Sequence, residues 1–276
     1  MIPLEYLLKF IGEDAPFGDI TSESIVPEVS CRALIRAEQE GIVAGLQEAG
    51  ALFSHFGVEV SPATSDGKQV KEGDALLTLS GPAKEILLVE RTALNIIGRM
   101  SGIATLTKRM MDHVKKENPK CRVAATRKTC PGLRVLDKKA VALGGGDPHR
   151  LGLSDGILIK DNHLVLVPLI EAIRSAKAKN SYRRIEIEVE TVEDALTAAQ
   201  EGADIILCDN MTPDRIRNTI MHLEKAGLRD RVTIELSGGI TAGTISEYAR
   251  TGADLISLGA LTHTVTNFSV TLEILI

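Results

Sequence analysis

The chain contains no tryptophan, and aromatic residues of all kinds make up only 3% of its 276 residues. Proteins that bind single-stranded nucleic acid stack bases on aromatic side chains, so this scarcity argues against such a role. Basic residues are not in excess either, because the formal net charge is −5 at pH 7. A protein that binds a phosphate backbone usually carries a positive excess. We therefore expect no nucleic-acid partner, although a local basic pocket for a small anion remains open.

Long apolar runs are also absent. No stretch approaches the roughly 20 consecutive apolar residues that a membrane-spanning helix needs. The N-terminal segment reaches Glu5, Lys9 and Glu13 too early for a secretory signal peptide. These features predict a cytoplasmic protein with no membrane partner. A hydrophobic content of 44% with 25% charged residues is ordinary for a globular protein and suffices for one large domain or two modest ones.

Cysteine is sparse and gives no sign of a metal site or a disulfide framework. The four cysteines, Cys31, Cys121, Cys130 and Cys208, form no CxxC pair and no cluster with histidine at zinc-binding spacing. We expect them to be reduced and mostly buried. The sequence also shows no Ser/His/Asp or Cys/His arrangement of the kind used in nucleophilic catalysis.

The first hundred residues are predicted to mix helices and strands. Apolar spacing predicts helices over 1–11 and 47–56, a strand over 31–37 and short β runs within 58–81. A helical stretch then begins at residue 83 and is too long for one ordinary helix. We expect Gly98 and Gly102 to break it or to pack it closely against a neighbour. This stretch is the predicted connection between two regions.

After Pro119 the pattern becomes regular. Apolar β runs alternate with helical segments, which is typical of parallel strands joined by right-handed crossovers. The predicted strands are 122–126, 156–160, 185–190, 204–208, 232–236 and 254–258, and the predicted helices lie near 131–142, 166–179, 191–201, 213–226 and 241–251. No GxGxxG follows the first strand, so a dinucleotide-binding sheet is disfavoured.

Polar residues follow each of the six strands. They are Arg127-Lys128-Thr129, Lys160-Asp161-Asn162-His163, Glu190, Asp209-Asn210, Glu235 with Ser237-Gly238-Gly239, and Gly259-Ala260. In an α/β barrel the carboxyl ends of all strands meet at one face, which carries the chemistry of such folds. Six polar ends in register therefore predict a site.

The residue types at these ends predict the ligand. Arg127, Lys128 and Lys160, joined by His149 and Arg150 from the preceding loop, would bind a polyanion, since arginine binds carboxylate and phosphate bidentately. Carboxylates beside phosphate-binding groups, here Glu190 and Asp209, usually hold Mg²⁺. The glycine turns after the last strands offer backbone N–H groups for a phosphate. Together these features fit a phosphorylated sugar pyrophosphate.

Other charged residues have a plainer interpretation. Arg134, Lys138 and Lys139 lie on one predicted helix and are expected to form a solvated face. Glu186 and Glu188 alternate with apolar residues, so they either fill a polar barrel interior or face helices.

Eight motifs in this order resemble the quinolinate phosphoribosyltransferase family, also called nicotinate-nucleotide pyrophosphorylase (carboxylating). They are ERTALNIIGRMSGIAT (90–105), TRKTCPGLR (126–134), GGGDPHRLGL (144–153), LIKDNH (158–163), EIEVET (186–191), LCDNM (207–211), LSGGIT (236–241) and SLGALTH (257–263). The resemblance covers almost the whole chain. It implies a pentosyltransferase that makes nicotinate mononucleotide, CO₂ and pyrophosphate from quinolinate and phosphoribosyl pyrophosphate, with Mg²⁺, in de novo NAD biosynthesis.

The resemblance also implies the architecture. We expect an N-terminal α/β sandwich domain over 1–103, to which the tail 268–276 returns, and an incomplete α/β barrel of about seven strands over 104–267. A homodimer is implied, or a hexamer built as a trimer of dimers, with active sites shared between subunits. In the family an arginine from the partner's N-terminal region completes each site, and Arg91 matches it.

Site roles carried over from the resemblance fall into three groups. The quinolinate pocket matches Arg127, His149, Arg150 and Lys160; the residues around the sugar pyrophosphate and its metal match Lys128, Glu190 and Asp209, with Thr129 beside them; and the phosphate turns match Ser237, Gly238, Gly239, Gly259, Ala260 and Leu261.

Two other functions stay open at this point. A phosphate-binding barrel isomerase would share the glycine turns but would not need the whole cation set. A related branch linked to molybdenum transport would keep the fold without quinolinate turnover, and it alters the Lys-Asp-Asn-His segment that is intact here at 160–163. One departure from the family pattern is Pro148, which stands where members usually have asparagine before the His-Arg pair.

Overall fold

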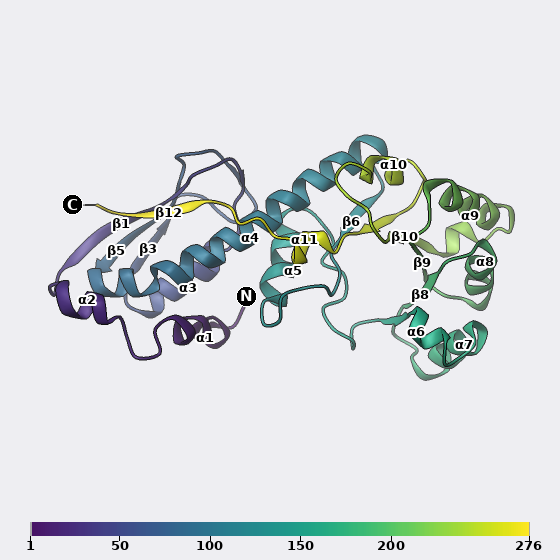
Figure 1. Ribbon diagram of the computed structural model, residues 1–276, viewed down its shortest axis with the longest axis horizontal. Coiled ribbons are helices and arrows are strands. Elements are labelled where there is room, and N and C mark those ends of the chain that lie inside the picture. The colour runs from purple at the N-terminus through teal and green to yellow at the C-terminus, as the bar shows by residue number, and fades with distance from the viewer. Residues whose placement is uncertain (1, 276) are drawn as a thin grey trace. The chain divides into compact units, whose positions relative to one another are not determined.

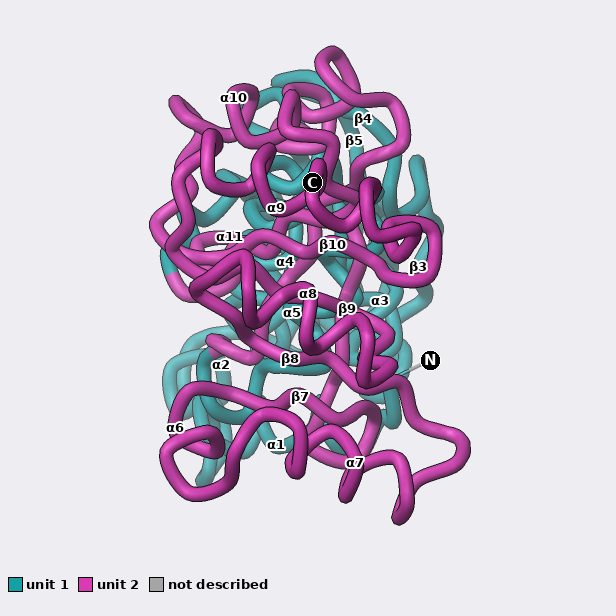
Figure 2. Tube along the Cα trace, turned by 90° about the vertical axis from the view of Figure 1, so that its right-hand side faces the viewer, with its two compact units in different colours: residues 1–108, 130–145, 264–276 teal, residues 109–129, 146–263 magenta. Residues whose placement is uncertain are grey.

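The computed structural model describes residues 2–275 and divides into two compact units (Figures 1 and 2). Unit 1 comprises residues 1–108, 130–145 and 264–276, and unit 2 comprises 109–129 and 146–263. The predicted division differs from this one. Its boundary at residue 103 lies inside a helix, and residues 130–145, placed by the prediction in the barrel domain, group with unit 1.

Unit 1 is built around a four-stranded antiparallel sheet. Its strands are β1 (Ser30–Ala37), β3 (Glu59–Pro62), β5 (Ala75–Pro82) and β12 (Val270–Leu275), in the order β12-β1-β5-β3, and β2 (Gly41–Ile42) pairs with β4 (Gln69–Val70). Its helices are α1 (Leu4–Asp14), α2 (Ile20–Ile25), α3 (Leu46–His55), α5 (Arg134–Leu143) and the first part of α4 (Ala83–Glu117). In β12, Ile274 pairs with Ala33, so the C-terminal strand lies beside β1.

Helix α4 runs unbroken through all 35 residues from Ala83 to Glu117. The sequence led us to expect a break or close packing at Gly98 and Gly102, and the structure shows close packing. A Cβ on Gly102 would lie 2.2 Å from the carbonyl oxygen of Thr266. Phe268 N donates to Gly98 O at 2.8 Å. A glycine destabilises a helix interior by only about 1 kcal/mol relative to alanine. The packing of α4 against the segment at Thr266 and Phe268 therefore outweighs the low helix propensity of the two glycines.

Helix α5 was expected to present its basic residues to solvent, and this expectation is wrong. Lys138 is only 4% exposed, and Lys139 Nζ lies 2.7 Å from Glu48 Oε1 on α3. Asp137 is fully buried and accepts a bidentate hydrogen-bond pair from Arg99, at 2.8 and 2.9 Å. A buried carboxylate needs such a partner, so these contacts fix α5 within unit 1.

Unit 2 is a parallel α/β fold, as predicted. Its strands are β6 (Arg122–Ala124), β7 (Ile157–Ile159), β8 (Ile185–Val189), β9 (Ile205–Asp209), β10 (Thr233–Ser237) and β11 (Leu255–Ser257), in the order β6-β11-β10-β9-β8-β7. Its helices are α6 (Asp161–Leu164), α7 (Leu169–Lys179), α8 (Val192–Glu201), α9 (Pro213–Lys225), the 3₁₀ turn η1 (Arg229–Arg231), α10 (Ile245–Ala249) and α11 (Ala260–His263).

The parallel sheet has six named strands and one further pairing. Asp147 forms an isolated parallel bridge with Ala124, on the side of β6 that no named strand covers. The Asp147 segment therefore takes the position of the seventh strand in the predicted barrel. On a flat sheet this segment would lie five strand spacings from β8, about 24 Å. Yet His149 Nε2 lies 3.6 Å from Glu186 Oε2 on β8. The sheet is therefore rolled, and its carboxyl ends face one another.

Within residues 2–275 no helix combines the length and apolar character that crossing a membrane requires.

Candidate active site

A cavity of about 690 Å³ opens where the strands of unit 2 end. Along β7, β8, β9 and β10, the residues that line it alternate with buried apolar residues, and after β6 and at β11 the lining residues are consecutive. The lining residues include Ala125 and Arg127 after β6, Leu158 and Lys160 on and after β7, Glu186 and Glu188 on β8, Leu207 and Asp209 on β9, Glu235 and Ser237 on β10, and Ser257 and Gly259 on and after β11. The period of two along the four alternating strands places one face of each toward the cavity.

The cavity carries basic and acidic groups in equal number. Its arginines and lysines are Arg127, Lys128, Arg150 and Lys160, and its carboxylates are Glu186, Glu188, Asp209 and Glu235. The basic set was predicted from the sequence; of the acidic set, Asp209 was given a role, Glu235 was placed among the polar strand ends, and Glu186 and Glu188 were left open. Lys160 is held within the cavity by Glu188, with 2.6 Å between Nζ and Oε2. Its cation is thereby placed before any ligand enters.

Glu188 and Asp209 lie close enough to influence each other. Burial raises the pKa of Glu188, the hydrogen bond from Lys160 lowers it, and the neighbouring Asp209 raises it. Asp209 in turn accepts a hydrogen bond from Asn210 Nδ2 at 2.5 Å. The carboxylate that accompanies Asp209 in the cavity is therefore Glu188.

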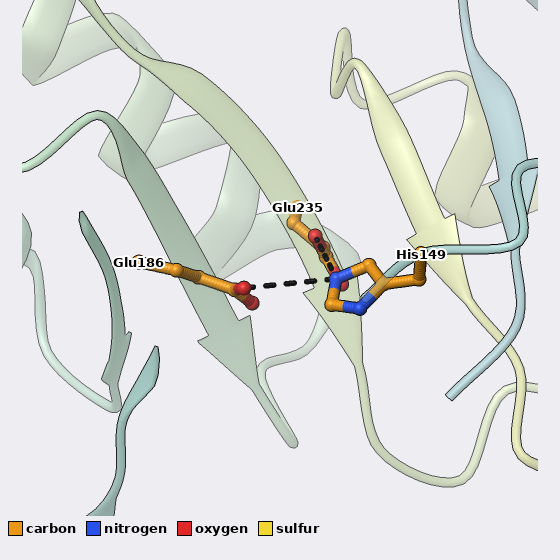
Figure 3. Close-up of side chains that lie close together, drawn as sticks. All are labelled: His149, Glu186 and Glu235. Atoms are coloured by element: carbon orange, nitrogen blue, oxygen red, sulfur yellow. Dashed lines mark ion pairs between the residues drawn. The ribbon is translucent and has the colours of Figure 1, made fainter. Parts of the chain in front are cut away.

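Two further carboxyl groups lie deeper and surround an imidazole. Glu186 is 4% exposed and Glu235 is 1% exposed. His149 Nε2 lies 3.6 Å from Glu186 Oε2 and 3.4 Å from Glu235 Oε2. Figure 3 shows the Nε2 edge of the ring turned toward both carboxylates, one from β8 and one from β10. Burial and the neighbouring Glu235 raise the pKa of Glu186 to about 7.

The turn before β7 aims His149 at these carboxylates. His149 has a φ of 56°, which residues other than glycine rarely adopt. Its backbone N donates to Asp147 Oδ1 at 2.8 Å, which holds the turn. Arg150 follows directly and donates to Gly156 O at 3.3 Å. Burial lowers the pKa of Arg150, yet a guanidinium stays protonated under all ordinary conditions. Strain at a functional site is a common way to fix a side chain.

The glycine turn after β10 cannot accept a larger residue. Gly238 has a φ of 96°, and a Cβ there would lie 2.2 Å from Asn210 Oδ1 and 2.7 Å from Asn210 N. Ser237, Gly238 and Gly239 all line the cavity, as do Gly259 and Ala260 of the second turn. Backbone groups thus form this side of the cavity, which suits binding of a phosphate.

Most of the predicted site residues meet in this cavity, but four do not line it. Eleven of them do: Arg127, Lys128, His149, Arg150, Lys160, Asp209, Ser237, Gly238, Gly239, Gly259 and Ala260. The other four are Arg91, Thr129, Glu190 and Leu261. Glu190 is exposed beyond the end of β8, Leu261 is buried, and Thr129 N donates to Arg127 O. Arg91 lies on α4 within unit 1, with an exposed side chain. The roles of all fifteen stay predictions.

Three acidic residues of the cavity had no predicted role in binding or catalysis, namely Glu186, Glu188 and Glu235, although Glu235 was among the polar residues at the strand ends. The signal for them was the alternation in β8, where Ile185, Ile187 and Val189 are buried and the two glutamates point to the other face. In a rolled sheet one face is the barrel interior, so alternation alone could have placed both glutamates there.

Mg²⁺ was expected between Glu190 and Asp209, and Glu190 does not line the cavity. Asp209 does, and it lies half-buried where the cavity also carries Lys128. Magnesium is commonly bound by one or two carboxylates together with substrate phosphates. Asp209 therefore fits such an ion when the ion arrives with a pyrophosphate.

Two family models match the chain. The model for the quinolinate phosphoribosyl transferase N-terminal domain matches residues 19–101, and the model for its C-terminal domain matches 103–273.

Related proteins match over nearly their full length. A protein of Methanothermobacter thermautotrophicus named "Probable nicotinate-nucleotide pyrophosphorylase (carboxylating)" is 43% identical over 98% of this chain and 98% of its own. The nicotinate-nucleotide pyrophosphorylase (carboxylating) of Mycobacterium leprae is 36% identical over 96% and 95%. The solved structure of the nicotinate-nucleotide pyrophosphorylase from Francisella tularensis superposes with a TM-score of 0.93 at 30% identity, covering 100% of this chain and 98% of that one. The chain therefore belongs to the quinolinate phosphoribosyltransferase family.

Proposed function

We propose that this cavity transfers a phosphoribosyl group from phosphoribosyl pyrophosphate to quinolinate and releases CO₂ and pyrophosphate. The product is nicotinate mononucleotide, a precursor in NAD biosynthesis. One observation carries the proposal: Arg127, Arg150 and Lys160 line one cavity together with two glycine turns. A dicarboxylate and a phosphorylated sugar can be bound there side by side. The names of the relatives agree with this activity, and the alternative linked to molybdenum transport is not favoured.

Quinolinate is a pyridine with two adjacent carboxylates. Arg127 and Arg150 are its main binding groups, because a guanidinium matches the geometry of a carboxylate with two parallel hydrogen bonds. Lys160 and His149 complete the pocket. Because Lys160 is already held by Glu188 at 2.6 Å, little rearrangement is needed to bring its ammonium to the substrate.

The sugar substrate occupies the other side of the cavity. Its 5′-phosphate binds the glycine turns, and its pyrophosphate binds Lys128. Asp209 would hold Mg²⁺, and the ion would supply charge neutralisation of the pyrophosphate leaving group when bound. These placements rest on residue chemistry and on the cavity lining.

Carboxylates stabilise the charge that develops during the reaction. As the bond from ribose C1 to pyrophosphate breaks, positive charge grows on the sugar ring. Glu188, in the place that the sequence analysis gave to Glu190, and Asp209 provide negative charge nearby. The quinolinate nitrogen then bonds to C1 and becomes cationic, which favours loss of the adjacent carboxylate as CO₂, and the electron pair left on that ring carbon takes up a proton from solvent. The chain contributes positioning and electrostatics to these steps.

We also propose that the protein works as a dimer with shared sites, or as a hexamer built of such dimers, in the cytoplasm. Support for sharing is the family's partner arginine, matched here by Arg91 on α4. Support for a reducing compartment comes from the cysteines, all four of which are free. Burial raises the pKa of both Cys121 and Cys208 to about 12, so neither forms a reactive thiolate at neutral pH.

The test is an assay of purified protein with one component omitted at a time. Nicotinate mononucleotide should form only when quinolinate, phosphoribosyl pyrophosphate and Mg²⁺ are all present, and it is measured by chromatography. Replacing quinolinate with nicotinate should abolish most of the activity, because a single carboxylate leaves part of the cation set unused. Equal turnover of both pyridines would overturn the proposal.

A further inference from the structure

His149 belongs to the proposed quinolinate pocket, but the two carboxyl groups beside it, Glu186 and Glu235, have no part in the mechanism above. One oxygen of each carboxyl group and a ring nitrogen of His149 all lie within 4.8 Å of one another. The two carboxyl groups come from different strands, β8 and β10, and the histidine from the strained turn before β7. A triad of titratable groups is thus brought together from distant parts of the chain, in the wall of the cavity.

Two of the carboxyl oxygens of Glu186 and Glu235 lack a hydrogen-bond partner. Glu235 Oε1 accepts a hydrogen bond from Ser257 Oγ. Glu186 Oε1 and Glu235 Oε2 are both buried and have no hydrogen-bond partner among the described residues. A buried ionised carboxylate normally has such partners, because desolvation without them is costly. A carboxyl group that carries a proton avoids much of this cost.

Two carboxylates this close cannot both ionise freely. Like charges at short distance separate the titration into two steps that belong to the pair, as in other carboxylate dyads. When protonated, His149 supplies one positive charge near both. That charge can compensate one carboxylate, and the second carboxylate is left to bind a proton.

The surrounding charges decide when the proton is bound. The groups that face the triad are Arg127 after β6, Arg150 beside His149, Lys160 after β7 and Glu188 on β8. With Lys128 and Asp209, the cavity holds four Lys or Arg side chains and four carboxyl side chains. If these eight groups are ionised their charges cancel, so a dianion entering the cavity meets a net attraction only from a protonated His149.

We infer that Glu186, Glu235 and His149 form one proton-holding unit, which positions His149 and takes up a proton when the dicarboxylate substrate binds. This inference rests on the proposed function, since it takes quinolinate as that dicarboxylate. The proton restores a positive balance behind the basic residues that bind the two carboxylates. Glu186 and Glu235 are positioning residues, because they act through His149 and Arg150.

A metal ion in the same place is disfavoured. The triad offers two carboxylates and an imidazole, which could ligate a cation. Arg150 and Lys160 lie near enough for their charges to lower the pKa of Glu186, and the same charges oppose a divalent ion at the triad. A proton bound to Glu186 or Glu235 neutralises that carboxylate and brings less positive charge near the basic residues than a divalent ion would.

The inference sets a pH window. Because the pKa of Glu186 is raised to about 7, the free protein already holds the proton near pH 6 and has lost it near pH 8. Uptake on binding should therefore rise from close to zero to close to one proton across this range. Linkage then requires the affinity for quinolinate to fall with rising pH, by up to about tenfold per unit.

The experiment is calorimetric titration of the full-length protein with quinolinate, without the sugar substrate, so that no reaction follows. Each titration is run near pH 6, 7 and 8 in two buffers of different ionisation enthalpy. The difference in observed heat gives the number of protons taken up. We expect that number to increase with pH. Binding of quinolinate with no proton uptake at any of these pH values would overturn the inference.

Two isosteric variants locate the proton. Glu186→Gln and Glu235→Gln each remove one acid, so the remaining carboxylate pairs with His149 and stays ionised. Both should bind quinolinate with little proton uptake and with an affinity nearly independent of pH. Glu193→Gln, on the exposed face of α8, is the matched control and should keep the wild-type count.

These titrations distinguish a failure of the proton inference from a failure of the proposed function. Wild-type uptake retained in both glutamine variants would place the proton elsewhere and refute the inference. Should neither variant fold, the wild-type titrations still decide, because they need no variant. Failure of the wild-type protein to bind quinolinate at all would instead refute the proposed function.

Discussion

At the scale of the residue, the cavity is a set of paired charges. Lys160 donates to Glu188, and His149 lies between Glu186 and Glu235. Each pairing fixes the direction of a cation that the proposed substrate needs. A substrate carboxylate therefore competes with these glutamates for the same cations. Removing a cation then has two effects: it weakens substrate binding and leaves a carboxylate without compensation.

Alanine at Arg127 or Lys160 should weaken quinolinate binding by roughly 1.5–3 kcal/mol, the usual range for a hydrogen bond to a charged group. The fold should survive, because both side chains border the cavity. Calorimetry with quinolinate measures the affinity, and thermal unfolding checks the fold.

Matched controls for these variants lie on the outside of unit 2. Lys179→Ala, at the end of α7, and Arg217→Ala, on α9, remove exposed side chains that do not line the cavity. Both should bind quinolinate like the wild type. Unchanged affinity in Arg127→Ala and Lys160→Ala as well would show that the substrate does not use this pocket.

Single residues were the hardest part to predict. The basic residues and glycines after the strands could be recognised because they follow apolar runs directly. Glu188 could not be separated from Glu190 by alternation, since both have the same parity. What separates them is where β8 ends, at Val189, and strand ends are poorly defined by sequence. The pairing of Lys160 with Glu188 depends on the parallel register of β7 and β8, in which Ile159 lies opposite Ile187, and the sequence does not give that register.

At the scale of the element, one helix depends on the small size of two glycines. Helix α4 presents Gly98 and Gly102 to the segment that leads into β12, and the carbonyl of Thr266 lies where a Cβ of Gly102 would be. A helix without side chains at these positions lets another backbone approach closely. The same glycines looked like helix breakers in the sequence, because propensity says nothing about what packs against a helix.

Gly102→Ala should therefore destabilise the protein by about 1–3 kcal/mol, the range for overpacking. The control is Gly12→Ala in α1, where no atom lies within 4 Å of the added Cβ. There the change should be neutral or stabilising by up to about 1 kcal/mol, because alanine favours helix. Urea unfolding of both variants measures the difference. Equal stability of the two would show that the approach of Thr266 does not constrain α4.

The strands and helices of unit 2 were the most predictable elements. Each predicted strand has a counterpart within two residues at either end, because buried parallel strands are continuous apolar runs. Helix α5 shows the limit of this reasoning. Its alternation with β6 pointed to a barrel helix, but the ion pairs of Lys139 with Glu48 and of Asp137 with Arg99 tie it to unit 1. Ion pairs between residues far apart in the sequence produce no periodic pattern, so the position of α5 could not be predicted from its sequence.

At the scale of the whole molecule, the proposal is a dimer in which each site draws Arg91 from the partner subunit. Arg91→Ala and Lys160→Ala proteins should each be nearly inactive alone. Mixed and reassembled, they should recover activity, because some dimers then contain one site free of both changes. Random pairing gives at most about a quarter of wild-type activity when damaged sites are silent, which follows from the non-additive behaviour of catalytic groups.

The control for this mixing experiment is a mixture of each variant with itself, taken through the same reassembly. Subunit exchange is verified with labelled protein. If exchange occurs and no activity returns, Arg91 serves its own subunit or does not take part in the reaction.

The central claim is that one cavity binds a pyridine dicarboxylate, attaches a ribose phosphate to its nitrogen and removes a carboxylate. The most direct measurement uses quinolinate labelled in its 2-carboxylate, with phosphoribosyl pyrophosphate and Mg²⁺. Our account predicts labelled CO₂ and nicotinate mononucleotide in equal amounts from the wild-type protein, with both lost together in Lys160→Ala. Nucleotide formed without release of label, or label released without nucleotide, would contradict it.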